Sequence, residues 1–199
     1  MKSVLLEALL VAVCGAVLAF AANAISPRGL RLGRDYFPGA MQPRTTQPIA
    51  SPGDTNSASA QWTALANRLK EKGLRLIDGA EAAKLFADPR RGQDLVIFID
   101  ARNEEHYQQG HIPGAFQFDH YHAENYLGAV LPACQAAQQI VVYCTGGDCE
   151  DSEFAALMLG EAGVPKDKLA VYGGGITEWM KEGKMIEKGA RNSGQLSKP

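Results

Sequence analysis

The sequence predicts an α/β fold with a central, mostly parallel β-sheet of about five strands and helices on both faces. From residue 61 onward, short apolar runs alternate with segments of helical period. The run Leu-Val-Ile-Phe-Ile at 95–99 has no polar position, which is typical of a strand covered on both faces. Strands that alternate with helices pair in parallel through right-handed crossovers. In such sheets, ligands bind beyond the C-terminal ends of the strands.

Each expected element has its own signal. The strands are short runs rich in apolar and β-branched residues, and the helices carry apolar residues at spacings of three and four. Gly73 ends the first helix, Asp78 can cap the second, and Asp88-Pro89 closes it. Pro132 should break the fourth helix. Strands are expected over 74–77, 95–99, 115–118, 140–143 and 169–172, and helices over 62–69, 80–86, 104–108, 123–137, 152–161 and 176–181.

Length and composition allow one ordinary domain with extensions. The chain has 199 residues, of which 46% are apolar and 21% charged, as in globular proteins. The formal net charge of −2 gives no reason to expect nucleic acid as a partner. We expect a transmembrane anchor or signal segment over 1–27, a flexible linker over 28–60, one domain over 61–190 and a C-terminal tail over 191–199.

The apolar segment from Val4 to Ile25 has two interpretations. It is long enough to cross a bilayer as a retained single-pass anchor, and the three arginines that follow it would then place the domain on the cytoplasmic side. Alternatively, the sequence Ala22-Asn23-Ala24 has the small-x-small form of a signal cleavage site, which would make the domain periplasmic or secreted. We favour the membrane anchor because of the length of the segment and the weak positive charge before it.

The stretch 139–152 carries the strongest sign of chemistry. An apolar strand delivers Cys144 into a turn that contains Gly146 and Gly147, and a helical pattern starts at Asp151 or Ser152. This places a thiol beside converging backbone N–H groups at the positive end of a helix. Thiols in such positions ionise easily and can hold an anionic or sulfur-rich adduct.

Four segments resemble rhodanese-like domains in their order and spacing. They are Asp100-Ala-Arg102, the GHIPGA sequence at 110–115, the Cys144 loop, and the GGGITEW sequence at 173–179. The resemblance covers roughly 74–189. It implies a rhodanese-like fold and a sulfurtransferase in which the Cys144 thiolate takes sulfane sulfur from a small-molecule or protein-bound donor, holds it as a persulfide and passes it to a thiol acceptor. No cofactor is expected.

The resemblance and the residue types together assign roles to the remaining site residues. The loop expected to bind substrate consists of Thr145, Gly146, Gly147, Asp148, Cys149 and Glu150. Asp100 and Arg102 are expected to form a structural pair beside this loop, and His111 to hydrogen-bond the backbone. Metal-binding residue types also occur together at Asp119, His120 and His122. The sequence offers no further ligand for them, so we expect no metal site.

The Cys144 loop departs from the family pattern in two ways. Members usually have Cys-x-x-Gly-x followed by Arg, Thr or Ser; Gly147 fits, but Cys149 stands at the last position. In addition, Asp148, Glu150 and Asp151 make the rim acidic. Nearby carboxylates raise a thiol's pKa and repel anionic donors. We therefore expect an uncharged or protein-bound persulfide donor rather than thiosulfate.

Two other functions remain open. Cys149 could attack the persulfide and form a disulfide with Cys144, which would make the domain a thiol–disulfide or sulfur-sensing module. Alternatively, the domain could be a non-catalytic binding platform at the membrane. Phosphatase chemistry is rejected because it needs an Arg to close the loop, and none lies between Cys144 and Arg191.

Overall fold

The computed structural model describes residues 10–11 and 55–198. The chain divides into two compact units, 1–50 and 51–199. In the first unit only Leu10 and Val11 are described, and both are helical. The anchor or signal segment expected over 1–27 otherwise lies outside the described residues, as does most of the expected linker. Within the described ranges, no helix combines the length and the apolar character needed to cross a membrane.

The second unit contains a five-stranded sheet in which every pair of neighbours is parallel. The strand order is β1-β5-β4-β2-β3, so β4 is central. The predicted α/β fold class is therefore confirmed, and each predicted strand is present. The bounds are β1 (Arg75–Ile77), β2 (Val96–Asp100), β3 (Phe116–Gln117), β4 (Gln139–Tyr143) and β5 (Leu169–Tyr172).

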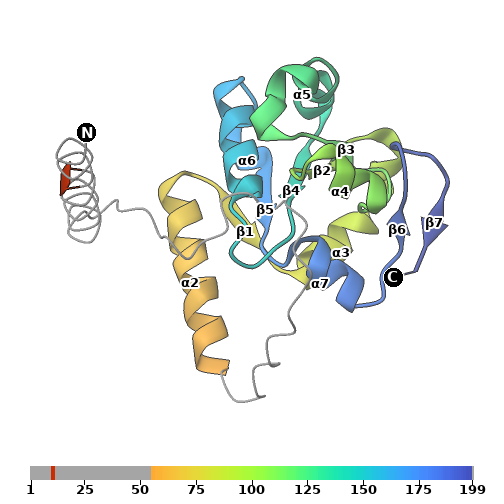
Figure 1. Cartoon of the computed structure of the whole chain (residues 1–199). Coiled ribbons are helices and arrows are strands. Elements are labelled where there is room, and N and C mark those ends of the chain that lie inside the picture. The colour runs from red at the N-terminus through yellow and green to blue at the C-terminus, as the bar shows by residue number, and fades with distance from the viewer. Residues whose placement is uncertain (1–9, 12–54, 199) are drawn as a thin grey trace, which may run out of the picture. The chain divides into compact units, whose positions relative to one another are not determined.

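Helices cover both faces of this sheet (Figure 1). One face packs against α2 (Thr55–Glu71), α5 (Leu127–Ala136) and α6 (Asp151–Glu161), and the other against α3 (Gly79–Phe86) and α7 (Gly175–Lys181). The remaining helical segments are α4 (Glu104–Gln109) and the 3₁₀ helices η1 (Pro89–Gln93), η2 (His120–Asn125) and η3 (Lys166–Lys168).

The central strand β4 shows why its sequence is apolar throughout. Ile140 and Val142 point into the core beneath α5 and α6, while Val141 and Tyr143 point into the core beneath α3 and α7. Side chains alternate between the two faces of a strand, so a strand covered on both faces needs apolar residues at every position. Trp179 of α7 fills the second core.

Local signals explain the helix ends. Asp78 accepts a hydrogen bond from the backbone N–H of Glu81 at 2.8 Å, so the predicted cap of α3 is confirmed. The predicted break at Pro132 is wrong, because Pro132 lies inside α5, and the kink lies earlier, at His122 within η2. Pro132 and Gly128, whose carbonyl would have accepted the missing N–H, are both exposed, so water can bind that carbonyl.

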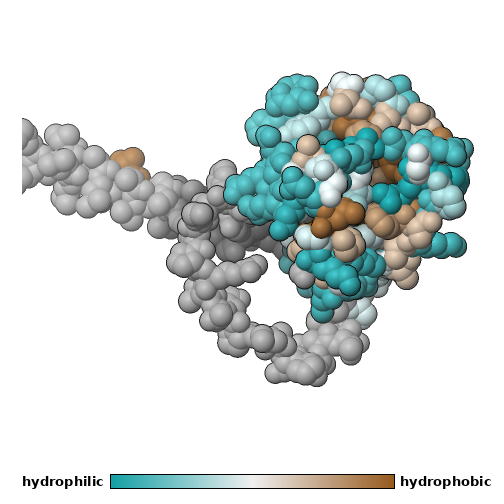
Figure 2. All heavy atoms as spheres, turned by 90° about the vertical axis from the view of Figure 1, so that its right-hand side faces the viewer, coloured by the Kyte–Doolittle hydropathy of each residue, from teal (hydrophilic) through white to brown (hydrophobic). Residues whose placement is uncertain are grey.

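The end of the chain folds back on the domain. β6 (Ile186–Glu187) pairs antiparallel with β7 (Leu196–Ser197), which lies in the range predicted as a C-terminal tail. Glu187 also forms a bridge with His111 of the GHIPGA turn. On the face of the domain seen in Figure 2, hydrophilic residues predominate and hydrophobic residues lie in small separate patches.

Candidate functional site

The register of the sheet brings the predicted motifs to one edge. Asp100 at the end of β2 lies opposite Tyr143 at the end of β4, and Tyr143 lies opposite Tyr172 at the end of β5. The residues that follow these strands, Cys144 among them, therefore leave the sheet at the same level. Motifs that are far apart in the sequence meet at this carboxyl edge, where open parallel sheets bind ligands.

The start of α7 holds the loop that follows Cys144. The backbone N–H of Ile176 donates to the carbonyl of Cys144 at 2.9 Å, and that of Thr177 donates to the carbonyl of Thr145 at 3.2 Å. The first turn of a helix has N–H groups without partners inside the helix. Here these groups bind the Cys144 loop, so the GGGITEW segment fixes its position.

Glycines are required where the two loops touch. Gly146 has a φ of +95°, and a Cβ at this position would lie 2.1 Å from the carbonyl oxygen of Gly174. Gly147 has a φ of +66°, and its N–H donates to the carbonyl of Gly173 at 3.3 Å. The adjacent glycines of the Cys144 loop thus allow a backbone-to-backbone contact that a side chain would prevent.

The Cys144 sulfur is buried and surrounded by hydrogen-bonding groups. Its Sγ lies 3.4 Å from Oγ of Ser152 and 3.5 Å from the carbonyl oxygen of Cys149. Hydrogen bonds to the thiolate from the Cys149 thiol, the Ser152 hydroxyl and the amides of Gly146 and Ser152 lower the pKa of Cys144 to about 7, although burial opposes this. A substantial part of Cys144 is therefore ionised near neutral pH.

The second thiol behaves in the opposite way. The Cys149 sulfur lies 3.4 Å from the carboxylate Oδ2 of Asp151, which is an alternative acceptor for its one proton. Its hydrogen bond to Cys144 keeps the proton on Cys149, and burial and the charges of Cys144 and Asp151 act in the same direction, so the pKa of Cys149 is raised well above its ordinary value. The sequence predicted opposing effects on the pKa of Cys144, from the loop amides and helix start on one side and the acidic rim on the other. The net shift is downward, and the carboxylate of Asp151 raises the pKa of Cys149.

One carboxylate of the rim has a cationic partner. Arg68 of α2 forms an ion pair with Glu150, with 3.0 Å between Nη1 and Oε1. Asp148 lies exposed at the tip of the loop. The rim that faces an incoming donor is therefore less negative than the sequence alone suggests.

Asp100 and Arg102 form a buried pair beside the loop. Arg102 binds the carboxylate through two nitrogens, with Nε 2.9 Å from Oδ1 and Nη2 2.6 Å from Oδ2 of Asp100. The same Nη2 donates to the carbonyl of Gly110 at 2.7 Å. The pair thus joins the end of β2 to the GHIPGA turn, and the Arg102 guanidinium interacts electrostatically with Cys144.

His111 lies in the interior of the domain, away from the sulfur's hydrogen-bonding partners. Its Nδ1 lies 3.0 Å from the carbonyl oxygen of Tyr107 and its Nε2 lies 3.3 Å from Oε2 of Glu187. The ring stacks on Tyr107 with 3.8 Å between centroids. These contacts connect α4, the GHIPGA turn and β6.

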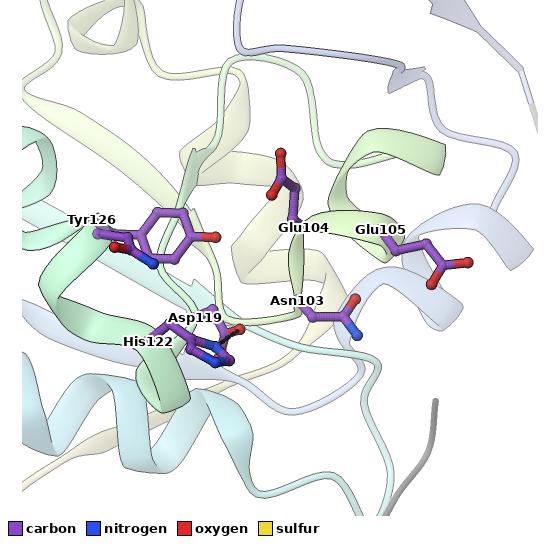
Figure 3. A pocket seen from close by; sticks show the side chains of 7 residues that line it. Asn103, Glu104, Glu105, Asp119, His122 and Tyr126 are labelled. Atoms are coloured by element: carbon purple, nitrogen blue, oxygen red, sulfur yellow. Dashed lines mark hydrogen bonds and ion pairs between the residues drawn. The ribbon is translucent and has the colours of Figure 1, made fainter. Parts of the chain in front are cut away.

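A hydrophilic cavity of about 580 Å³ lies near the ends of β2 and β3 (Figure 3). Within it, Nδ1 of His122 lies 3.1 Å from Oδ2 of Asp119, whereas the ring of His120 stacks on Phe154 outside the cavity lining. In the part of the chain that the structure describes, no three His, Cys, Asp or Glu side chains are grouped as metal ligands. The cavity is lined by Asn103, Glu104, Glu105, Asp119, His122, Asn125 and Tyr126.

Sequence reasoning missed two residues of the site. Ser152 was expected only as a helix start, yet its hydroxyl lies 3.4 Å from the Cys144 sulfur. The available signal was a Ser at the start of the helix that follows the irregular Cys144 loop. Arg68 was not singled out at all, because nothing in the sequence indicates that α2 lies beside the loop.

Comparison with known proteins places the chain in a family. The family model of the rhodanese-like domain matches residues 80–182, just over half of the chain. A curated relative, the HTH-type transcriptional regulator Rv0324 of Mycobacterium tuberculosis, is 34% identical over 101 residues. The match covers 51% of this chain and 42% of that protein, so the chain spans less than half of the relative's length.

Solved structures are also similar to this chain. The BH2092 protein from Bacillus halodurans has a TM-score of 0.47 and 24% identity, over 67% of this chain and 85% of its own. The polysulfide-sulfur transferase from Wolinella succinogenes has a TM-score of 0.44 and 18% identity, over 69% of this chain and 95% of its own. Thiosulfate sulfurtransferase from Pseudomonas aeruginosa has a TM-score of 0.43 and 21% identity, over 59% of this chain and 20% of its own.

The family model covers the region in which the Asp-x-Arg pair, the GHIPGA turn, the Cys144 loop and the GGGITEW helix start meet at one edge of a parallel sheet. On this match, the chain belongs to the family of rhodanese-like domain proteins.

Proposed function

We propose that the protein is a sulfurtransferase that carries sulfane sulfur as a persulfide on Cys144. The observation that carries the proposal is the environment of this sulfur. Three kinds of donor, a thiol, a hydroxyl and backbone amides, converge on one buried Sγ and lower its pKa to about 7. A nucleophilic thiol needs this ionisation, whereas a cysteine that only fills the core does not.

The reaction divides into two displacements that need no external oxidant. The Cys144 thiolate attacks the outer sulfur of a donor R–S–SH. A bond forms between this sulfur and Sγ, the S–S bond of the donor breaks, and RS⁻ leaves. In the second step, an acceptor thiolate attacks the outer sulfur of the persulfide, and Cys144 leaves as a thiolate. The amides and the Ser152 hydroxyl that stabilise this thiolate assist its departure.

The charges around the loop favour a donor of low charge. Asp148 is exposed and Asp151 lies beside Cys149, while within the described part of the chain Glu150 alone of the three rim carboxylates has an ion pair with an arginine. A dianion such as thiosulfate is repelled by such a rim. A persulfide of a small thiol or of a protein cysteine is more compatible, so we propose a persulfide donor.

The test uses the reduced full chain carrying Cys14→Ser, treated separately with thiosulfate and with glutathione persulfide. Intact-mass spectrometry reports the sulfur content of this protein and of its Cys144→Ser and Cys149→Ser variants. We expect one added sulfur atom with glutathione persulfide, retained in Cys149→Ser and lost in Cys144→Ser. No added sulfur with either donor would overturn the proposal and favour a binding platform, which would tolerate Cys144→Ser.

The contact between the two thiols supports a second candidate function. Cys149 could attack the inner sulfur of the persulfide, releasing hydrosulfide and forming a Cys144–Cys149 disulfide that a dithiol would reduce again. The raised pKa of Cys149 keeps this thiol protonated, and a protonated thiol attacks slowly, so we rank this candidate second. Loss of two hydrogens without retained sulfur, in a reaction that requires both cysteines, would move it to first place.

A further inference from the structure

Helix α2 lies outside the residues that the family model matches, yet it contacts the Cys144 loop at Glu150 and also contacts Gly173, which hydrogen-bonds that loop. Its residues are 55–71, whereas the match begins at residue 80. Because α2 packs in the same core as β4 and α6, it is part of the folded domain.

The first contact is an ionic one at the end of the loop. Arg68 bridges two carboxylates of the α6 start, with Nη1 3.0 Å from Oε1 of Glu150 and Nε 2.8 Å from Oε2 of Glu153. Lys72 also forms an ion pair with Glu153, which is only 3% exposed. A buried carboxylate needs such partners, and Arg68 of α2 and Lys72, just after α2, provide them.

The second contact is with Gly173, which lies between β5 and α7. Trp62 of α2 packs directly on Gly173, where a Cβ would lie 2.8 Å from Cζ3 of the indole ring. Gly173 in turn accepts the hydrogen bond from the N–H of Gly147. Helix α2 thus contacts the loop directly at Glu150 and, through Gly173, indirectly at Gly147.

The position of Glu150 makes the ionic contact relevant to the sulfur. Glu150 directly follows Cys149, whose carbonyl oxygen lies 3.5 Å from the Cys144 sulfur, and it occupies the N-cap position of α6, the helix that carries Ser152. The Glu150 carboxylate is thus carried by the residue next to one neighbour of the sulfur and two positions before the other. The ion pair with Arg68 places a cation next to a carboxylate that would otherwise oppose ionisation of the thiol.

We propose that Arg68 is a positioning residue of the sulfur site and that it acts through Glu150. Helix α2 would then contribute to the function of that site. This inference rests on the proposed sulfurtransfer but concerns residues outside the family match. The other charged or titratable groups around the sulfur, Cys149, Asp151 and Arg102, belong to the loop, to α6 and to the end of β2.

The experiment compares Arg68→Gln with Lys70→Gln in the full chain carrying Cys14→Ser. Lys70 is exposed on the same helix and, among the described residues, forms no ion pair, so this variant makes the same charge change away from the loop. The first readout is the pH profile of Cys144 alkylation by iodoacetamide, located by peptide mass spectrometry. The second is the rate of persulfide formation with glutathione persulfide at pH 7.

We expect Arg68→Gln to shift the alkylation midpoint upward by about 0.5 pH unit and to slow persulfide formation about twofold. These effects are small because the Arg68–Glu150 ion pair is partly exposed. Lys70→Gln should match the parent chain, and Arg68→Lys, which retains the charge, should recover most of the loss. The double variant Arg68→Gln/Glu150→Gln should return to the parent midpoint, because the carboxylate that Arg68 offsets is then absent.

Two outcomes would overturn the inference: an Arg68→Gln profile equal to that of Lys70→Gln, or a raised midpoint that persists in the double variant. Circular dichroism checks folding, and the double variant decides the matter if Arg68→Gln alone does not fold. Alkylation needs no sulfur donor, so the two proposals fail separately. A shifted profile in a chain that accepts no sulfur would reject sulfurtransfer and retain the role of Arg68.

Discussion

The hydroxyl of Ser152 lies 3.4 Å from the sulfur of Cys144, across a loop that separates them by seven residues. The relationship is possible because the sulfur leaves the end of β4 and Ser152 lies in the first turn of α6. The hydroxyl and the amide of Ser152 both bind the thiolate. One residue at a helix start thus contributes two of the hydrogen bonds that ionise the nucleophile.

Replacement of Ser152 by alanine should raise the pKa of Cys144. A hydrogen bond to a charged group contributes about 1.5 kcal/mol, so we expect the midpoint of iodoacetamide alkylation to move up by about one pH unit. Ser152→Thr keeps the hydroxyl and should stay near the parent value. A midpoint that does not move in Ser152→Ala would show that the hydroxyl does not stabilise the thiolate.

Stability should depend on pH through the two thiols, with opposite signs. Folding lowers the pKa of Cys144 from 9.0 to about 7, so the free energy of unfolding should rise by about 2 kcal/mol between pH 7 and 9 and lose this gain as pH falls through 7. Folding raises the pKa of Cys149, so its contribution is present below pH 9 and lost above it.

Urea unfolding at pH 6, 8 and 10 would measure this dependence. We expect the highest stability near pH 8 to 9 in the parent chain. The profile should be flatter in Cys144→Ser, which removes the interaction between the two thiols. A parent profile as flat as that of the variant would contradict the assignment of a folded-state thiolate to Cys144.

Two adjacent glycines should differ sharply in their tolerance of alanine. In Gly146→Ala the new Cβ would lie 2.1 Å from the carbonyl oxygen of Gly174, so the two loops must separate. In Gly147→Ala the new methyl group meets no atom within 4 Å, and only the left-handed backbone is strained, at about 1 kcal/mol. We expect Gly146→Ala to lower the free energy of unfolding by about 3 kcal/mol. Equal urea midpoints would argue against the backbone contact.

Arg102→Ala should be strongly destabilising. The substitution leaves the fully buried carboxylate of Asp100 without its guanidinium partner and removes the donor to the carbonyl of Gly110. Breaking one side of a buried pair costs about 3 to 5 kcal/mol. Asp100→Asn/Arg102→Ala, which removes the buried charge as well, should recover part of this loss in denaturant unfolding. If the double variant is no more stable than Arg102→Ala, an unpaired charge is not the cause.

Features governed by local sequence could be predicted. The strand over 95–99 was evident because every residue of that run is apolar, and Asp78 was recognisable as a cap because a side-chain oxygen next to a helix start satisfies backbone N–H groups. The arrival of Cys144 at the carboxyl edge follows from parallel pairing alone. The break predicted at Pro132 was wrong because the cost of proline in a helix depends on whether water can reach the unpaired carbonyl. The local sequence does not reveal that exposure.

Features that depend on how helices cross could not be predicted. Arg68 and Glu150 are 82 positions apart, and both belong to surfaces rich in charge, so the sequence does not select this pair among many. The opposite pKa shifts of Cys144 and Cys149 depend on which way each sulfur points. The number of acidic residues near a cysteine in the sequence does not indicate which way the sulfur points.

The strand order has a consequence for how the chain matures. β1 pairs with β5, and the carbonyl of Cys144 is held by the N–H of Ile176, so the contacts around the thiol join segments that are synthesised far apart in time. Sheets built from such distant pairings fold slowly, because long chain loops close before any contact compensates for the lost entropy. A nascent chain that ends before Gly173 lacks the groups that hold the loop. The backbone contacts that hold the Cys144 loop therefore form only after the segment from Gly173 to Thr177 has been synthesised.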